Sequence, residues 1–175
     1  MSYFMDGFSK DKLTILFFLD TLGTELTREQ ITTAAAEREI VPFFELQSAV
    51  YEMEEAGFLA AVPRTWGQVY AVTEKGRETL MMFLEQLPIS LREDLANYAD
   101  ECREKLLRET QFSSCYEKSS NGGYLATLKI LERNDILLQV SILLPDADNV
   151  RAICRKWPDR AESVYKSIIS ELHNG

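Results

Sequence analysis

The chain has 175 residues, of which 46% are hydrophobic and 27% charged, and its formal net charge is −9. This length accommodates one large domain or two small ones, and the composition is that of a globular protein rather than a disordered one. The longest apolar runs, 13–19 and 136–144, fall well short of the roughly 20 residues that a membrane-spanning helix needs. We therefore expect no membrane span. The N-terminus lacks the pattern of a secretory signal, so a cytoplasmic location is predicted.

Three helices are predicted in the first third of the chain. Apolar spacing indicates a first helix over Lys10–Leu22, which ends at Gly23. A capping-box pattern opens a second helix over Thr27–Arg38. A third helix begins at Val41-Pro42 and ends near Ala56, because proline is preferred in a first turn and a glycine follows at position 57.

A hairpin and a fourth helix are predicted next. Phe58–Val62 and Gln68–Val72 are β-tolerant apolar runs, and the segment between them, 63–67, has turn chemistry. Thr73 offers an N-cap oxygen for a helix that runs to about Leu87. The order is therefore three helices, a hairpin and a capped helix.

Two short segments give this half of the chain a family resemblance. Residues 53–58, MEEAGF, are similar to the "LEEEGL" pattern that ends the recognition helix of MarR- and PadR-type winged-helix regulators, and residues 72–77, VTEKGR, are similar to their "LTEKG" pattern. The whole chain also resembles a bacterial family, found mainly in Clostridia, that is known only as a winged-helix domain protein of unknown function. The resemblance implies a winged helix-turn-helix with the third helix as recognition helix, and a regulator that binds DNA.

A long charged helix is predicted after Pro88 and extends to about Thr110. Its apolar residues form a narrow stripe, with spacings of four and three residues: Leu91, Leu95, Tyr98, Cys102 and Leu106. Such a stripe suits pairing with a second copy in a homodimer, and it equally suits packing within its own chain. The residues leave both alternatives open.

The last third of the chain is predicted to be a small sheet with one helix. Gln111–Lys118, Tyr124–Glu132 and Asp135–Leu144 read as three antiparallel strands in a meander. The even-numbered residues of the third strand, from position 136 to 144, are all apolar, which predicts one buried face. A final helix over 147–172 covers it, and we expect Pro158 to kink or divide that helix.

The predicted fold class is therefore α+β: an N-terminal winged helix-turn-helix in residues 1–88, a connecting helix in 89–110, and a three-stranded meander covered by a C-terminal helix in 111–175.

Charge does not favour the function that the resemblance implies. Residues 1–88 hold fourteen acids and seven bases, and the predicted third helix has no lysine or arginine. Affinity for duplex DNA depends largely on basic side chains that contact phosphates. If DNA is bound, the candidate contacts are the few bases around this helix and the polar residues on its outer face: Arg28, Arg38, Gln47, Ser48, Tyr51, Arg64, Lys75 and Arg77.

The alternative function is a protein-protein interaction module. Phe43 at the start of the third helix and Trp66 in the hairpin turn are large apolar groups, and aromatic residues are enriched at protein interfaces. We expect Phe44 to fill the core instead.

No enzyme, cofactor or metal site is predicted. The single histidine, His173, is the third residue from the end of the sequence, and no glycine-rich loop precedes a helix. The three cysteines, at positions 102, 115 and 154, are widely spaced and lack a zinc-binding pattern. We expect free thiols.

Overall fold

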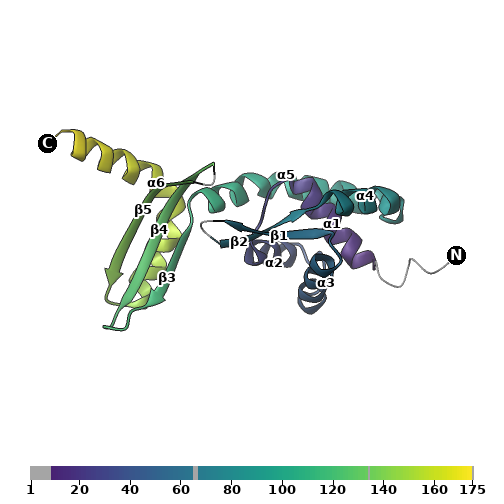
Figure 1. Cartoon of the computed structure of the whole chain (residues 1–175), viewed down its shortest axis with the longest axis horizontal. Helices are drawn as coiled ribbons and strands as arrows, with labels where there is room; N and C mark the ends of the chain where they lie inside the picture. Colours follow the sequence, from purple (N-terminus) through teal and green to yellow (C-terminus); the bar gives the residue numbers. More distant parts are fainter. Residues whose placement is uncertain (1–8, 65–66, 134, 175) are drawn as a thin grey trace. The chain divides into compact units, whose positions relative to one another are not determined.

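The computed structural model describes residues 9–64, 67–133 and 135–174 (Figure 1). Within these ranges the chain forms six α-helices, a two-stranded hairpin and a three-stranded antiparallel sheet, which confirms the predicted α+β class. The chain divides into two compact units, Met1–Leu106 and Leu107–Gly175. We describe each unit by itself.

The first unit follows the predicted order of elements. These are α1 (Lys10–Leu22), α2 (Arg28–Glu37), α3 (Phe43–Glu55), β1 (Leu59–Arg64), β2 (Gly67–Val72), α4 (Glu74–Phe83), a 3-10 turn η1 (Leu84–Gln86) and most of α5 (Ile89–Gln111). The fourth helix is shorter than predicted, because its last turn tightens into η1.

Local chemistry explains where these helices begin and end. The Thr27 hydroxyl accepts from the Gln30 N–H and the Gln30 side chain accepts from the Thr27 N–H, so the capping box before α2 is present. The helix α1 ends at Gly23 with φ of 65°, a left-handed conformation that glycine adopts without strain. Thr73 caps α4 by accepting from the Gly76 N–H, and its hydroxyl also donates to the Gly57 carbonyl. The threonine and glycine of the TEKG segment thus join the hairpin to the end of α3.

The apolar stripe of α5 packs within its own chain. Leu95, Tyr98, Cys102 and Leu106 are all buried in one core with residues of α1, α2 and α3. The Tyr98 ring stacks on Phe18 of α1, with 5.4 Å between ring centroids. This stripe is therefore not a surface for a second copy.

The prediction that Phe44 fills the core is wrong. Its side chain is 82% exposed, because α3 buries the face that carries Leu46, Val50 and Met53. Position 44 lies two residues before Leu46, and residues two apart on a helix point in different directions.

The second unit is the predicted meander with one covering helix. It contains β3 (Ser114–Lys118), β4 (Tyr124–Glu132), β5 (Asp135–Leu144) and α6 (Ala147–His173), and the sheet order is β3-β4-β5. Trp157 and Ala161 of α6 pack against Leu128 and Ile130 of β4. The strand β3 starts three residues later than predicted, because α5 extends to Gln111.

The predicted burial of one face of β5 is only partly right. Along β4 the side chains of Ala126, Leu128 and Ile130 are buried, whereas on β5 those of Leu138, Val140 and Ile142 are half-buried and Ile136 is 41% exposed. The helix α6 lies over the middle of the sheet and leaves the β5 side partly open.

Pro158 is predicted to kink or divide the last helix. It does not divide it, because α6 is continuous from Ala147 to His173, and Figure 1 shows this helix bent along its length. Proline at position 158 cannot donate to the carbonyl of Cys154, four residues earlier. The Ser114 hydroxyl of β3 donates to that carbonyl at 3.2 Å instead. The Cys154 carbonyl, which lacks its usual helical donor because of Pro158, therefore accepts a hydrogen bond from a side chain of the sheet.

Candidate functional site

The outer face of α3 carries an aromatic and acidic stripe. Phe44, Ser48, Tyr51 and Glu55 recur at spacings of four, three and four, so they lie on one side of the helix, and all four are exposed. Phe43 is 55% exposed and its ring meets that of Phe44 edge to face, with centroids 5.6 Å apart. We call the residues Phe43, Phe44, Ser48, Tyr51, Glu52 and Glu55 the α3 face.

Two of the three polar residues predicted as DNA contacts on α3, Gln47 and Ser48, already have hydrogen-bond partners. The Gln47 amide donates to the Thr32 hydroxyl of α2 at 2.9 Å, and the Ser48 hydroxyl donates to the Glu52 carboxylate at 2.9 Å. Lys12 of α1 forms an ion pair with Glu52, and its hydrogen bond is the main cause that lowers the pKa of that carboxyl. Tyr51, the third polar residue of α3 that was predicted to contact DNA, is 58% exposed.

Three of the five candidate cations are bound to carboxylates. Arg64, at the end of β1, donates twice to Glu25, and these hydrogen bonds raise the pKa of the arginine. The guanidinium of Arg38 donates to Glu101 of α5 at 2.7 Å. Arg28 lies 3.7 Å from Glu54 of α3 and also donates to the Tyr70 hydroxyl.

The other two candidate cations bind backbone carbonyls near the start of α4. The Lys75 ammonium donates to the Ala56 carbonyl at 2.6 Å and lies over the Phe58 ring. The Arg77 guanidinium donates to the Val72 carbonyl at 3.0 Å. Both groups stabilise the junction of α3, β2 and α4. The remaining predicted site residue, Trp66, lies outside the described residues.

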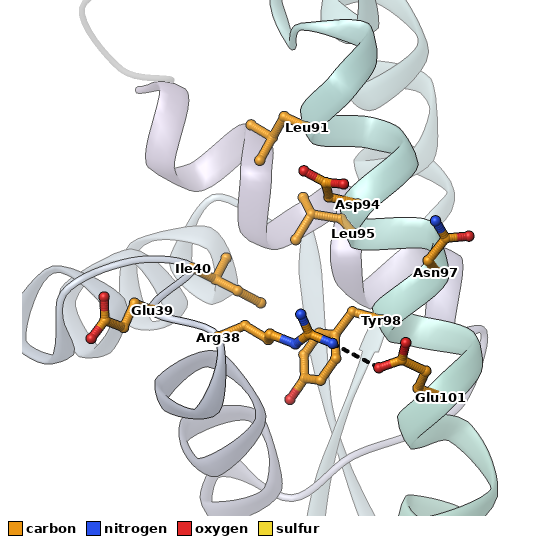
Figure 2. Close-up of a pocket in the computed structure, with 9 residues that line it drawn as sticks. All are labelled: Arg38, Glu39, Ile40, Leu91, Asp94, Leu95, Asn97, Tyr98 and Glu101. Carbon is orange, nitrogen blue, oxygen red and sulfur yellow. Dashed lines mark hydrogen bonds and ion pairs between the residues drawn. The ribbon is translucent and has the colours of Figure 1, made fainter.

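A pocket of about 490 Å³ lies between α5 and the connection from α2 to α3 (Figure 2). Its apolar wall is formed by Ile40, Leu91 and Leu95. Its charged groups are mostly acidic, since Glu39, Asp94 and Glu101 line it with Arg38, which is bonded to Glu101. The candidate cation Arg38 therefore faces this pocket, and its charge is already balanced there.

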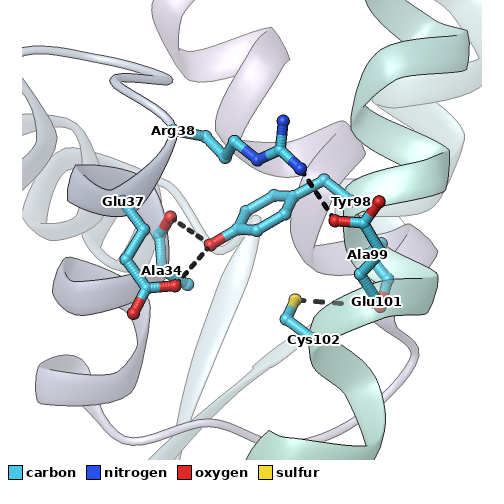
Figure 3. Close-up of polar contacts among 7 residues, drawn as sticks. All are labelled: Ala34, Glu37, Arg38, Tyr98, Ala99, Glu101 and Cys102. Carbon is cyan, nitrogen blue, oxygen red and sulfur yellow. Dashed lines mark hydrogen bonds and ion pairs between the residues drawn. The ribbon is translucent and has the colours of Figure 1, made fainter.

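A buried phenol lies beside this pocket (Figure 3). The Tyr98 hydroxyl donates to the Ala34 carbonyl at 2.9 Å and lies 3.2 Å from a Glu37 carboxylate oxygen. Burial, together with the charge of Glu37, raises the pKa of this phenol. The Arg38 guanidinium lies 4.8 Å from the centre of the ring. These contacts attach α2 to α5.

The possible metal ligands and the three cysteines are considered next. Residues 9–64, 67–133 and 135–174 contain no cluster of three His, Cys, Asp or Glu side chains with the geometry to hold a metal ion. The three cysteines are free, and burial raises the pKa of Cys102 and of Cys154. A raised pKa keeps a thiol protonated and lowers its reactivity. Across the same ranges, no helix has the length and apolar character to span a bilayer.

Comparison with known proteins places the chain in a family. A family model described as "Domain of unknown function (DUF4364)" matches residues 11–172. The chain belongs to the DUF4364 family. The match runs through both units of this DUF4364 member. No curated protein and no solved structure matches the chain.

The sequence of this DUF4364 member predicts α3 and the bases around it, but not the acids that pair with three of those bases. Glu25, Glu54 and Glu101 appear in the sequence only as part of the acidic excess. Each lies far along the chain from its arginine, by 39, 26 and 63 positions respectively. The aromatic stripe had a visible signal, because positions 44 and 51 are seven apart and lie outside the apolar periodicity of α3.

Proposed function

We propose that residues 1–88 form a winged helix whose third helix contacts a protein partner. The order of three helices, a hairpin and a capped helix supports the winged helix. The isolated bridge between Leu26 and Tyr70 supports it further, because it joins the hairpin to the segment before α2. In this arrangement α3 is the element presented to a partner, as the second helix of a helix-turn-helix is presented to DNA.

The chemistry of the α3 face supports a protein as that partner. Phe44 and Tyr51 are 82% and 58% exposed, and exposed aromatic groups are costly to keep in water without a use. Tyrosine and other aromatic residues often form the centre of protein interfaces. The acids Glu52 and Glu55 border them, so the matching surface on the partner is apolar with basic residues around it.

The proposal rests mainly on the ion pairs that the candidate cations already form within the chain. A typical DNA-binding protein neutralises about 6 to 10 phosphates with lysine and arginine. Here Arg28, Arg38 and Arg64 are each beside a carboxylate, so a phosphate would compete with a charge already in place. The α3 face itself adds negative charge, which repels the DNA backbone.

DNA binding remains the second candidate, because the resemblance to MarR- and PadR-type regulators favours it and Gln47, Ser48 and Tyr51 lie on α3. DNA binding requires Arg28, Arg38 and Arg64 to break their ion pairs with carboxylates and to contact phosphates instead. A homodimer that gathers the bases of two copies would assist this exchange.

Site-specific photo-crosslinking tests the proposed partner. Phe44 is replaced by photoreactive benzoylphenylalanine in the full chain, which is expressed in its native host and irradiated. We expect one crosslinked protein with a basic surface, and about tenfold less of it when Tyr51→Ala removes a central aromatic group. Met81 of α4 is the matched control position, because it is 77% exposed and lies off the α3 face.

Equal capture from positions 44 and 81 would contradict the proposal, as would crosslinking to nucleic acid from position 44.

A further inference from the structure

The strand β5 forms a long free edge of the sheet in the second unit. It spans ten residues and, among the described residues, pairs only with β4. From Ile136 to Leu144 it contains no charged side chain. Natural edge strands are commonly protected by shortness, charge or proline, because their unpaired backbone groups recruit other strands. The opposite edge, β3, has this protection, since it is five residues long and includes Glu117 and Lys118.

The backbone direction of β5 follows from the bonds of β4. Lys129 donates its N–H to the Ser113 carbonyl. The backbone N–H and C=O groups of the odd-numbered residues of β4 therefore point toward β3, and those of the even-numbered residues point toward β5. The even-numbered residues of β5, such as Val140 and Ile142, pair with them. The N–H and C=O groups of Gln139, Ser141 and Leu143 therefore point away from the sheet, and all three residues are exposed.

The core is also incomplete on this side. An apolar groove of about 300 Å³ runs between β5 and α6. Val140 and Ile142 line it from the strand, and Trp157 and Val164 line it from the helix. A strand added beside β5 would bring its own apolar side chains over this groove and cover the half-buried face.

Charge indicates where two copies of the chain are able to meet. Residues 1–106 hold nineteen acids and ten bases, whereas residues 107–175 hold nine of each. The whole net charge of −9 thus lies in the first unit. Two copies that approach through their first units repel each other through net negative charge, while the second units carry no net charge.

We propose that the chain forms a homodimer by antiparallel pairing of β5 with β5 of a second copy. With Val140 on the two-fold axis, Gln139 of each copy lies opposite Ser141 of the other, and their outward backbone groups exchange hydrogen bonds. The same register sets Leu138 against Ile142, so apolar side chains meet on the α6 side. The contact is isologous, as a closed two-fold dimer requires.

Sedimentation equilibrium of the full chain tests the pairing and its register. The wild type is expected near 40 kDa, twice the chain mass of 20.0 kDa. The double variant Gln139→Lys with Ser141→Lys sets like charges directly opposite each other at two places. We expect it to raise the dissociation constant by about tenfold or more.

The charge-swapped variant Gln139→Lys with Ser141→Glu is the matched control. It sets lysine opposite glutamate in the same register, so the dimer is retained. Both variants are expected to fold, because the side chains of Gln139 and Ser141 are exposed and neither bonds to β4. Circular dichroism melts check this. A monomeric wild type, or equal dissociation constants for the two double variants, would overturn the proposal.

Discussion

The Tyr98 phenol is held by a ring stack and a hydrogen bond in the core of the first unit. It is 6% exposed, stacks on Phe18, and donates to the Ala34 carbonyl near the end of α2. A buried hydroxyl with a good acceptor stabilises the fold, whereas the same acceptor left without a donor costs free energy. Tyr98 therefore fixes α2, and with it the position from which α3 begins.

We predict that Tyr98→Phe lowers the free energy of unfolding by about 1 to 2 kcal/mol at neutral pH, because the Ala34 carbonyl loses its donor. The raised pKa keeps the folded phenol protonated while the unfolded one ionises near 10.0. The stability that the phenol contributes is therefore present below pH 10 and is lost as the pH rises further. Urea unfolding of both proteins across this range measures the difference.

The matched control for Tyr98 is Tyr51→Phe, which removes an exposed hydroxyl and should leave stability unchanged. An equal loss in both variants, or a gap between wild type and Tyr98→Phe that widens above pH 10, would contradict this role.

At the scale of the element, α6 shows how a residue unsuited to a helix is accommodated. Pro158 lies inside a continuous helix of 27 residues. Pro158 has no N–H to donate to the Cys154 carbonyl, which accepts a hydrogen bond from the Ser114 hydroxyl instead. The Arg108 guanidinium donates to the Pro158 carbonyl at 3.3 Å. These contacts attach α6 to β3 and to the end of α5 within the second unit.

We predict that Ser114→Ala lowers the free energy of unfolding by about 1 kcal/mol, because the Cys154 carbonyl loses its donor. The same change should cost much less in a Pro158→Ala background, where the new N–H at position 158 bonds that carbonyl. A double-mutant cycle by chemical denaturation measures the coupling. Additive effects would show that the serine and the proline are independent.

Most elements could be predicted from the sequence because their signals are local. Caps such as Thr27 and Thr73, and the left-handed glycine at position 23, fix helix ends through neighbours within four residues. The continuity of α6 was not predictable, since the donor to Cys154 comes from a serine 40 positions away. The α3 face was predicted only in part, because periodicity does not tell which of Phe43 and Phe44 a helix buries, and the structure exposes both.

At the scale of the whole molecule, net charge is divided unevenly between the two units. The first unit carries all of it, together with the α3 face and three arginines beside carboxylates. The second unit has no net charge, and β5 forms a free edge of its sheet. We therefore assign partner contact to the acidic unit and self-association to the neutral one.

Fluorescence anisotropy with generic duplex DNA, at low salt and at several higher salt concentrations, tests most directly whether the first unit binds DNA rather than a protein. We expect no binding that depends on salt, because three of the five candidate cations form ion pairs with carboxylates of the same chain and the α3 face is acidic. Binding that falls steeply with salt, and that Arg64→Ala together with Arg77→Ala weakens, would contradict this expectation and identify the first unit as a DNA-binding domain.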